Sequence, residues 1–520
     1  MPASLRLRSA ILLFFIAACA FSTCGQIPPP KPNPLQLPVG EGTCSVEKSC
    51  SELAPGMILS AEGPSPLEEN LRHLTDEIGG RISGSAEADK AVGWAVEAFH
   101  HAGVDEIHTE KFSIPVGWSE GKTRVDVLAP AAFPVRATAG GWSPATPEGG
   151  ITADVVDVGD GDEAGFAKAG PAAVKNSIVL VHSQLLVTWQ DLDDVDLNQP
   201  AIIDRAVSAG AAAIFWMSTR PSILLYRHTN TVDGTLEKLP QAVVAREDAE
   251  RMARFLAKKV KVTVRLDMPN KITGPVESEN VVAEIRGREN PKEFVLLGAH
   301  LDSWELGTGA LDNGCNAAMV VDAARVIHAT GTIPRRSIRF VLFTGEEQGM
   351  LGSWAYAKAH RAELDNMDAA IIFDSGSGHV TGYSLGGRKD AAAALADVVA
   401  LLKPLGATEL TFEAGADTDN FDFMLEGVPT LVANQDPANY MLNYHAASDT
   451  FDKVDLLELK RQVAISAITA FAIADMQGRL GPRQSRAEIE SLMKETGLAE
   501  TMKVEGLEPF WENGTRGREP

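Results

Sequence analysis

The sequence is poor in positive charge. Its 520 residues include 47 lysines and arginines against 70 aspartates and glutamates, which gives a formal net charge of -23 at pH 7. Such a charge repels nucleic acid phosphates and anionic membranes, so we expect neither as a partner. The other proportions, 45% hydrophobic and 22% charged residues, fit a globular protein. Its length exceeds one ordinary core, so we expect an insertion or two domains.

The start of the sequence lacks a hydrophobic run long enough to span a bilayer comfortably. The apolar run Ala10–Ala18 follows two arginines, which is typical of a secretory signal peptide over residues 1–20. We therefore predict an exported protein, periplasmic or secreted, without a membrane span. The residues before Cys19 also match a bacterial lipoprotein signal, so a lipid anchor at Cys19 stays open as an alternative.

Cysteine is scarce, with five residues in the whole chain. Cys19 and Cys24 lie in or beside the predicted signal peptide. Cys44 and Cys50 then form the natural disulfide pair in an oxidising compartment. Cys315 remains; a thiolate is a good zinc ligand, but a small buried cysteine is the commoner state, so we predict a buried thiol.

Composition and periodicity divide the rest of the chain. Residues 21–60 are rich in proline and predict a semi-extended linker. In residues 61–119, two amphipathic patterns separated by a Gly-rich turn predict two helices, and strand-like runs follow. Residues 120–275 alternate short β-branched runs with helical patches, which predicts a small α/β unit with its own core. Its His182 and His228 are isolated, so we predict no chemistry there.

Short hydrophobic runs alternate with helical patterns over residues 276–482. This alternation predicts a largely buried sheet with helices on its faces, so the fold class is α/β. In such sheets the ligand site lies at the carboxyl ends of the strands. Residues 483–520 form a C-terminal extension, with one predicted helix and a polar tail.

Polar residues gather where three of these runs end. His300 ends one run, Glu346 and Glu347 end the next, and Asp374 ends a third. Imidazole and carboxylate groups are common zinc ligands. Two adjacent carboxylates at a buried sheet end repel each other and are costly to desolvate unless a cation lies beside them.

Two loop residues extend this set. Asp312 lies on a Gly-rich loop before a predicted helix, and His445 lies shortly before a predicted helix start at 448–450. Each alone has an ordinary explanation, such as a helix cap. Independent caps and turns need not bring two histidines and three carboxylates together, so we predict one metal centre. The predicted ligands of its two Zn2+ ions are His300, Asp312, Glu347, Asp374 and His445.

Two further carboxylates have predicted roles. Asp302 lies two residues after His300 and is placed to orient its imidazole ring. Glu346 is the predicted general base, which takes a proton from metal-activated water and later delivers it to the leaving amine. Both are predicted catalytic residues.

The segments HLDSWELGTGALDNG, GEEQGMLG, TDNF and YHAASDT resemble the zinc exopeptidase family of bacterial leucyl aminopeptidases and glutamate carboxypeptidase. The resemblance runs from about Leu67 to Asp475 and is greatest to the plasma glutamate carboxypeptidase branch. It implies a three-layer α/β/α phosphorylase/hydrolase-like catalytic domain over 61–119 and 276–482. It also implies a protease-associated domain inserted at 120–275.

The resemblance further implies that His300 and Asp374 bind one zinc, that Glu347 and His445 bind the other, and that Asp312 bridges them. Asn313 and Thr344-Gly345 depart from the family pattern at positions that are not ligands. The implied activity is hydrolysis of short peptides or dipeptides, of aminopeptidase or carboxypeptidase type. A non-catalytic receptor on the same scaffold and a glutaminyl cyclase-like enzyme stay open as alternatives, and so does a homodimer.

Overall fold

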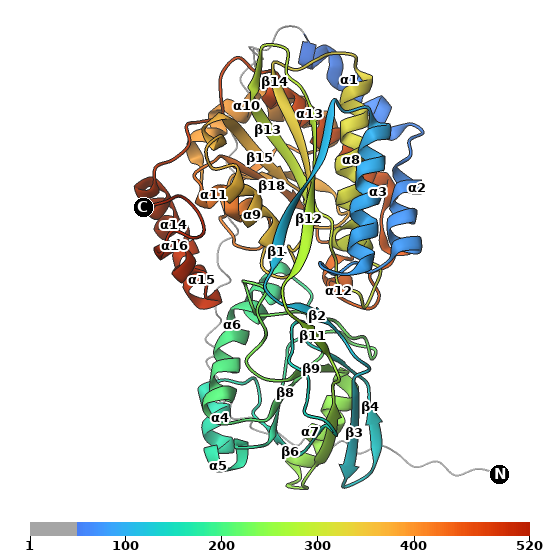
Figure 1. Cartoon of the computed structure of the whole chain (residues 1–520), viewed down its shortest axis with the longest axis vertical. Helices are drawn as coiled ribbons and strands as arrows, with labels where there is room; N and C mark the ends of the chain where they lie inside the picture. The colour runs from blue at the N-terminus through green and yellow to red at the C-terminus, as the bar shows by residue number, and fades with distance from the viewer. Residues whose placement is uncertain (1–48) are drawn as a thin grey trace, which may run out of the picture. The chain divides into compact units, whose positions relative to one another are not determined.

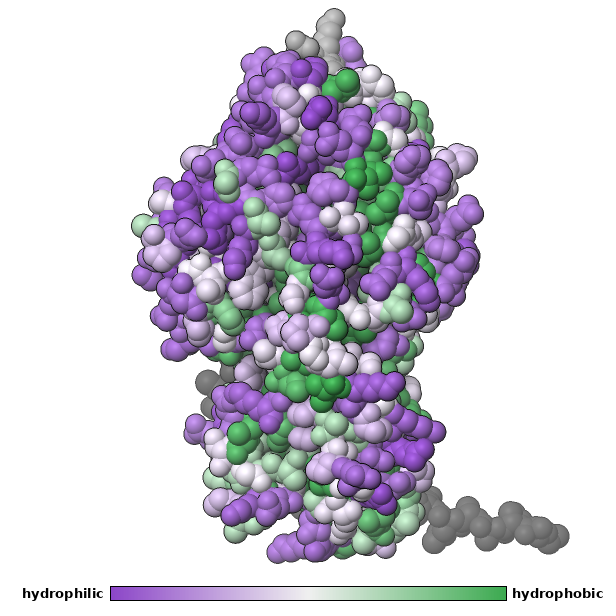
Figure 2. All heavy atoms as spheres, in the orientation of Figure 1, coloured by the Kyte–Doolittle hydropathy of each residue, from purple (hydrophilic) through white to green (hydrophobic). Residues whose placement is uncertain are grey.

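The computed structural model describes residues 49–520. The predicted signal peptide, the lipid anchor at Cys19 and the position of Cys44 lie outside these residues, so the Cys44–Cys50 pair stays a prediction. Within residues 49–520, no helix has the length and apolar character needed to cross a membrane. The face drawn in Figure 2 is hydrophilic over most of its area, with hydrophobic side chains in separate patches.

The first sheet has eight strands in the order β1-β12-β14-β13-β15-β18-β16-β17 (Figure 1). Strands β14, β13, β15 and β18 run parallel. Their carboxyl ends therefore meet at one edge of the sheet. The strands are β1 (Glu106–Ile114), β12 (Val276–Ile285), β13 (Asn290–His300), β14 (Arg336–Phe343), β15 (Met367–Ile372), β16 (Val380–Ser384), β17 (Glu409–Thr411) and β18 (Thr430–Gln435).

Helices cover both faces of this sheet. Successive side chains of a strand point to opposite faces, and in β13 Val295 packs with one set of helices while Phe294 packs with the other. One face is covered by α1 (Ser49–Glu62), α2 (Leu67–Arg72), α3 (Ala86–Ala102), α8 (Cys315–Ala329), α10 (Ala392–Leu402) and α13 (Leu456–Asp475). The other is covered by α9 (Leu351–Ala359) and α11 (Asn420–Leu425). The predicted three-layer α/β/α fold is confirmed.

Helix α1 begins inside the segment 21–60, whose composition predicts a linker, so the linker prediction is wrong for residues 49–60. Ala54, Met57 and Ala61 are buried and pack in the core with α8 and α13. Their spacing of three and four residues is that of one helix face. The proline-rich composition of the neighbouring residues, together with Pro55 inside the helix, concealed this spacing.

A second eight-stranded sheet, in the order β4-β3-β10-β6-β7-β8-β9-β5, is formed within residues 120–275. Its central strands β6 to β9 run parallel. Helix α6 (Trp189–Ser208) packs on one face and α7 (Arg246–Ala257) on the other. The strands are β3 (Arg124–Ala129), β4 (Phe133–Val135), β5 (Ala137–Ala139), β6 (Ile151–Asp157), β7 (Ile178–Val181), β8 (Ala213–Met217), β9 (Gln241–Val244) and β10 (Thr263–Asp267).

Two short strands, β2 (Gly117–Ser119) and β11 (Lys271–Thr273), come before and after the inserted sheet in the sequence and pair antiparallel with each other. Within the insertion, α4 (Glu163–Ala169) and α5 (Pro171–Val174) follow β6. The hydrophobic clusters on its two faces also contain Trp304 and Ala446 from outside the insertion. The expectation of an α/β unit with its own core is therefore incomplete, because this core is shared with segments that flank predicted site residues.

The C-terminal extension forms three helices instead of one helix and a polar tail. They are α14 (Arg486–Thr496), α15 (Leu498–Glu505) and α16 (Glu508–Glu512). Leu492 and Trp511 pack in a cluster with Phe421 of α11, and the buried Arg516 pairs with Asp422 at 2.8 Å. The expectation failed because its apolar residues are widely spaced among charged ones, and their burial depends on packing against one another and against distant segments such as α11.

Candidate metal centre

Three neighbouring strands deliver the first polar residues to one edge of the sheet. His300 is the last residue of β13, Glu346 and Glu347 follow β14, and Asp374 follows β15. The order of these strands in the sheet is β14-β13-β15. His300 therefore lies between the other two strand ends.

Two loops bring the remaining predicted ligands to this edge. Asp312 lies in the turn Ala310–Gly314 before α8, and the peptide bond between Asp312 and Asn313 is cis. His445 follows the short helix α12 (Tyr440–Asn443) and has a φ of 55°. This left-handed conformation is uncommon for a residue with a side chain, and surrounding contacts must hold it.

The two carboxylate oxygens of Asp312 face different histidines. Oδ1 lies 3.2 Å from Nε2 of His300, and Oδ2 lies 3.3 Å from Nε2 of His445. His300 Nε2 is also 3.0 Å from Asp374 Oδ1, and His445 Nε2 is 3.0 Å from Glu347 Oε2. The five predicted ligands thus form two groups that share Asp312.

Glu346 lies beside these groups and is more open to solvent than the histidine next to it. Its Oε2 is 4.0 Å from Nε2 of His300, and its side chain is 12% exposed where that of His300 is 1% exposed. Ligand atoms of His300, Glu346 and Asp374 lie within 4.8 Å of one another. A carboxylate so placed can reach an atom of a substrate bound at this edge.

Asp302 links His300 to the loop that carries Glu346. Nδ1 of His300 lies 3.1 Å from the main-chain oxygen of Asp302 and 3.5 Å from its carboxylate. A carbonyl oxygen only accepts, so Nδ1 carries a ring proton, and Nε2 is the nitrogen that faces Asp312 and Asp374. The carboxylate accepts hydrogen bonds from the Ser83 hydroxyl at 3.0 Å and from the Glu346 N–H at 3.3 Å. Asp302 therefore orients the histidine with its main chain as well as with its side chain.

Buried negative charge is concentrated at this edge. Within residues 49–520, the ion-pair partners of Asp312 and Glu347 are the two histidines. Burial raises the pKa of Glu347 to about 7. The negative charge of Asp312 raises it further, while His445 acts in the opposite direction. Burial also raises the pKa of Glu346 well above its usual value. A bound divalent cation would remove most of this desolvation and repulsion cost.

The donor atoms fit zinc. Imidazole nitrogen and carboxylate oxygen are ligand types that zinc accepts. Among the described residues, no donor hydrogen-bonds to the buried Oε1 of Glu347. A bound cation would satisfy this oxygen, as it would the excess of carboxylates around it.

Cys315 is not part of this group. Its side chain is fully buried, and its Sγ donates to the main-chain oxygen of Leu311 at 3.4 Å. Burial raises the pKa of the thiol above its usual value, which disfavours the thiolate that a metal would need. The predicted buried thiol is confirmed.

Some residues that hold this arrangement gave no signal in the sequence. Asp449, predicted to begin a helix, accepts hydrogen bonds from the N–H groups of Leu311 and Asp312 at 2.7 and 3.1 Å. His228, predicted to be isolated, stacks on His445 with ring centroids 5.6 Å apart. Both contacts join segments far apart in the sequence, and no local spacing indicates them.

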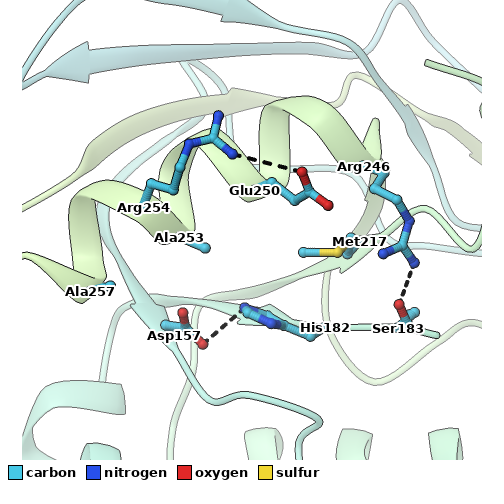
Figure 3. Close-up of a pocket in the computed structure, with 9 residues that line it drawn as sticks. All are labelled: Asp157, His182, Ser183, Met217, Arg246, Glu250, Ala253, Arg254 and Ala257. Carbon is cyan, nitrogen blue, oxygen red and sulfur yellow. Dashed lines mark hydrogen bonds and ion pairs between the residues drawn. The ribbon is translucent and has the colours of Figure 1, made fainter. Parts of the chain in front are cut away.

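A cavity of about 530 Å³ lies at the carboxyl ends of β6, β7 and β8 in the inserted sheet (Figure 3). Four of its charged side chains form two pairs: His182 Nε2 is 3.1 Å from Asp157 Oδ1, and Arg254 is 3.7 Å from Glu250. The fifth, Arg246, donates to the main-chain oxygen of Ser183. Its described lining residues form no group of three metal ligands.

Comparison with known proteins adds an independent line of evidence. The model for peptidase family M28 matches residues 280–469. Carboxypeptidase Q of Mus musculus is 32% identical over 415 residues, which cover 79% of this chain and 86% of that protein. The crystal structure of a peptidase M28 precursor from Shewanella amazonensis SB2B is 28% identical with a TM-score of 0.78, and the match covers 84% of this chain and 99% of that one. BSAP, a zinc aminopeptidase from Bacillus subtilis, shares the fold at 19% identity with a TM-score of 0.61 over 81% and 97% of the two chains.

The matched segment 280–469 contains every predicted metal ligand, Glu346 and Asp302. The likeness to carboxypeptidase Q extends over most of both chains, so it includes the insertion as well. The predicted family and the prediction of a peptidase are confirmed by these matches. The chain belongs to peptidase family M28.

Proposed function

We propose that this protein is a two-zinc exopeptidase that hydrolyses the peptide bonds of short peptides or dipeptides. The observation that carries the proposal is the position of Asp312, whose two oxygens face two different histidines. Each histidine also has a second carboxylate of its own, Asp374 or Glu347. The names carboxypeptidase Q and zinc aminopeptidase, borne by relatives, support the exopeptidase class and the choice of metal.

In this proposal His300 and Asp374 would hold one zinc, His445 and Glu347 would hold the other, and Asp312 would be shared between them. When bound, the zinc ions supply Lewis-acid polarisation of the scissile carbonyl and activation of the attacking water. The protein fixes the ligands beforehand, because His300 is held by Asp302 and the turn of Asp312 is held by other residues of the chain.

Glu346 is the general base and then the general acid. It takes a proton as the water oxygen bonds to the carbonyl carbon, and it returns a proton to the amine nitrogen as the C–N bond breaks. Its main-chain N–H is bonded to Asp302, which also orients His300. One carboxylate therefore sets the position of the base relative to the metal ligands, and Asp302 acts as a positioning residue.

The decisive experiment combines metal analysis with a peptide panel. Purified protein should contain two zinc ions per chain, lose activity on chelation and regain it when zinc is added. Free dipeptides should be compared with dipeptides blocked at the amino end, at the carboxyl end and at both ends. Activity that survives complete metal removal would refute the metal mechanism, and indifference to both blocks would refute the restriction to chain ends. A requirement for a free amino end would indicate aminopeptidase activity, and a requirement for a free carboxyl end would indicate carboxypeptidase activity.

A further inference from the structure

The segment Ser218–His228, here called the insertion strap, runs beside the loop that carries His445. Tyr226 and Ala446 form an antiparallel bridge. The main-chain oxygen of His445 accepts a hydrogen bond from the N–H of Arg227 at 3.0 Å. The backbone of the proposed metal ligand is thus bonded to the insertion.

Arg220 of the strap binds the same loop with its side chain. Nε donates to the main-chain oxygen of Leu442 at 3.2 Å, and Nη2 donates to that of Tyr444. The guanidinium also lies 4.9 Å from the ring centre of Tyr226, and the side chain is 1% exposed. Its planar, fixed fork can hold two carbonyl groups at once, which an ammonium group does less well. Arg220 therefore fixes the chain immediately before His445.

The strap is itself anchored in the insertion. Arg227 is fully buried, forms ion pairs with Glu120 and Glu305, and donates to the main-chain oxygen of Ala139 at 3.1 Å. Glu305 lies outside the insertion, in the loop after β13. The strap is therefore tied to the inserted sheet and to the catalytic segment.

His445 depends on such support from its surroundings. Its φ of 55° is in the left-handed region, which a residue with a side chain retains where contacts hold it. The imidazole stacks with two neighbouring rings, whose centroids lie 3.6 Å away in Tyr444 and 5.6 Å away in His228. His228 belongs to the strap, so the insertion contacts both the backbone and the ring of this residue.

We propose that the insertion strap is a working part of the metal centre, in which Arg220 is a positioning residue that holds His445 for metal binding. The strap then sets the affinity of the metal position that includes His445 and Glu347, and it acts less on the position of His300 and Asp374. This inference rests on the proposed function, because it takes His445 as a ligand. It gives residues 120–275 a role that their own composition does not indicate.

The test is a calorimetric titration of Zn2+ into the metal-free full-length chain. The wild type should show two binding steps, and His445→Ala should lose one of them, which identifies that step. Arg220→Gln should weaken the same step by about 10- to 100-fold, as expected when a group that orients a ligand is lost. The other step should change by less than about twofold. Arg220→Lys, which keeps the charge without the fork, should give an intermediate loss.

Arg254→Ala is the matched control, because this arginine is exposed on α7 of the same insertion. It should leave both steps unchanged. Thermal unfolding of the metal-free variants shows whether each is folded. Unchanged affinities in folded Arg220→Gln would overturn the inference, and so would equal weakening of both steps, since that indicates general disruption. A wild type without two steps would instead overturn the proposed function, which separates the two failures.

Discussion

Two sheets of this chain place polar side chains at the carboxyl edge of parallel strands, and the two edges differ in how their charges are paired. In the first sheet, the buried His300 meets Glu346 and Asp374, whose side chains are 12% and 9% exposed, so carboxylates outnumber histidines there. In the inserted sheet, Asp157 at the end of β6 pairs with His182 after β7, and the two side chains are 27% and 33% exposed. The first edge has excess buried negative charge, and the second is locally balanced.

If the first edge is the metal site, as proposed, the contrast indicates that a strand-end position alone does not define such a site. Both edges satisfy the rule that ligands bind beyond the carboxyl ends of parallel strands. At the first edge, desolvated carboxylates carry a free-energy cost that a divalent cation relieves. At the second edge, the carboxylate already has a cationic partner and remains partly hydrated. The demand for an ion therefore arises from unpaired buried charge.

The largest expected difference between the two edges appears on replacing an acid–base group. Glu346→Gln keeps the shape of the side chain but cannot take a proton, so kcat should fall by about 10²- to 10⁴-fold. Zinc content should stay at the wild-type value. Initial rates on a dipeptide and metal analysis of the same samples measure both. His182→Gln, the corresponding change at the second edge, should leave kcat nearly unchanged; a near-normal kcat in Glu346→Gln would mean that the base is wrongly assigned.

Trp304 tests whether the two regions share one core. It is buried, with its ring 6.2 Å from that of Trp142 in the insertion and 6.0 Å from that of His445. Trp304→Ala should lower the free energy of unfolding by about 3–5 kcal/mol, because a large buried side chain is replaced by a cavity. Denaturant titration measures this change. Trp304→Phe, which keeps an aromatic ring, should lose less, and a loss below about 1 kcal/mol in Trp304→Ala would indicate independent cores.

The elements with local periodicity could be predicted from the sequence. The apolar runs that became β13, β14 and β15 are buried on both faces, and the helical spacing of α8 is uninterrupted. Strand-end residues could also be grouped, because parallel neighbouring strands align their carboxyl ends. The position of α1 was missed, since proline-rich composition outweighed a short apolar spacing.

Contacts between distant segments could not be predicted in this way. Asp449 reaches the N–H groups of the Asp312 turn across more than a hundred residues of sequence. Arg220 binds main-chain carbonyl groups of the loop before His445. Every residue has such a group, so the sequence does not indicate which ones an arginine will bind. The histidines and carboxylates of the insertion predicted no site within it. Its contacts with the His445 loop are hydrogen bonds to main-chain oxygens, which that prediction did not consider.

Asp449 is a buried carboxylate at the edge of the first sheet that is not among the proposed metal ligands. Burial raises its pKa to about 7, while the N–H groups of Leu311 and Asp312 lower it. Asp449→Asn replaces an acceptor oxygen by a donor, so one N–H of the turn should lose its partner. Zinc affinity should fall by about 10- to 100-fold, measured by competition with a chelator. Asp452→Asn, at an exposed position nearby, is the control; an unchanged affinity in Asp449→Asn would show that the turn is held by other contacts.

The smallest expected effect is the stability contributed by the pair at the second edge. The contact with Asp157 raises the pKa of His182 despite its burial. Burial raises the pKa of Asp157, but His182, the Gly159 N–H and nearby positive charge together bring it below its usual value. The histidine contribution is complete below its unfolded pKa of about 6.5 and is lost as pH rises through the raised value. The aspartate contribution is present above about pH 3.9 and is lost as pH falls through the lowered value.

The pair therefore stabilises the fold mainly between about pH 4 and 7, by about 0.2–1 kcal/mol, because both side chains are partly exposed. His182→Gln should reduce the free energy of unfolding more at about pH 5.5 than at about pH 8.5, as measured by urea titration. The same change should not alter zinc binding. If the effect did not vary with pH, or if zinc content fell, the second edge would not be the balanced counterpart of the first.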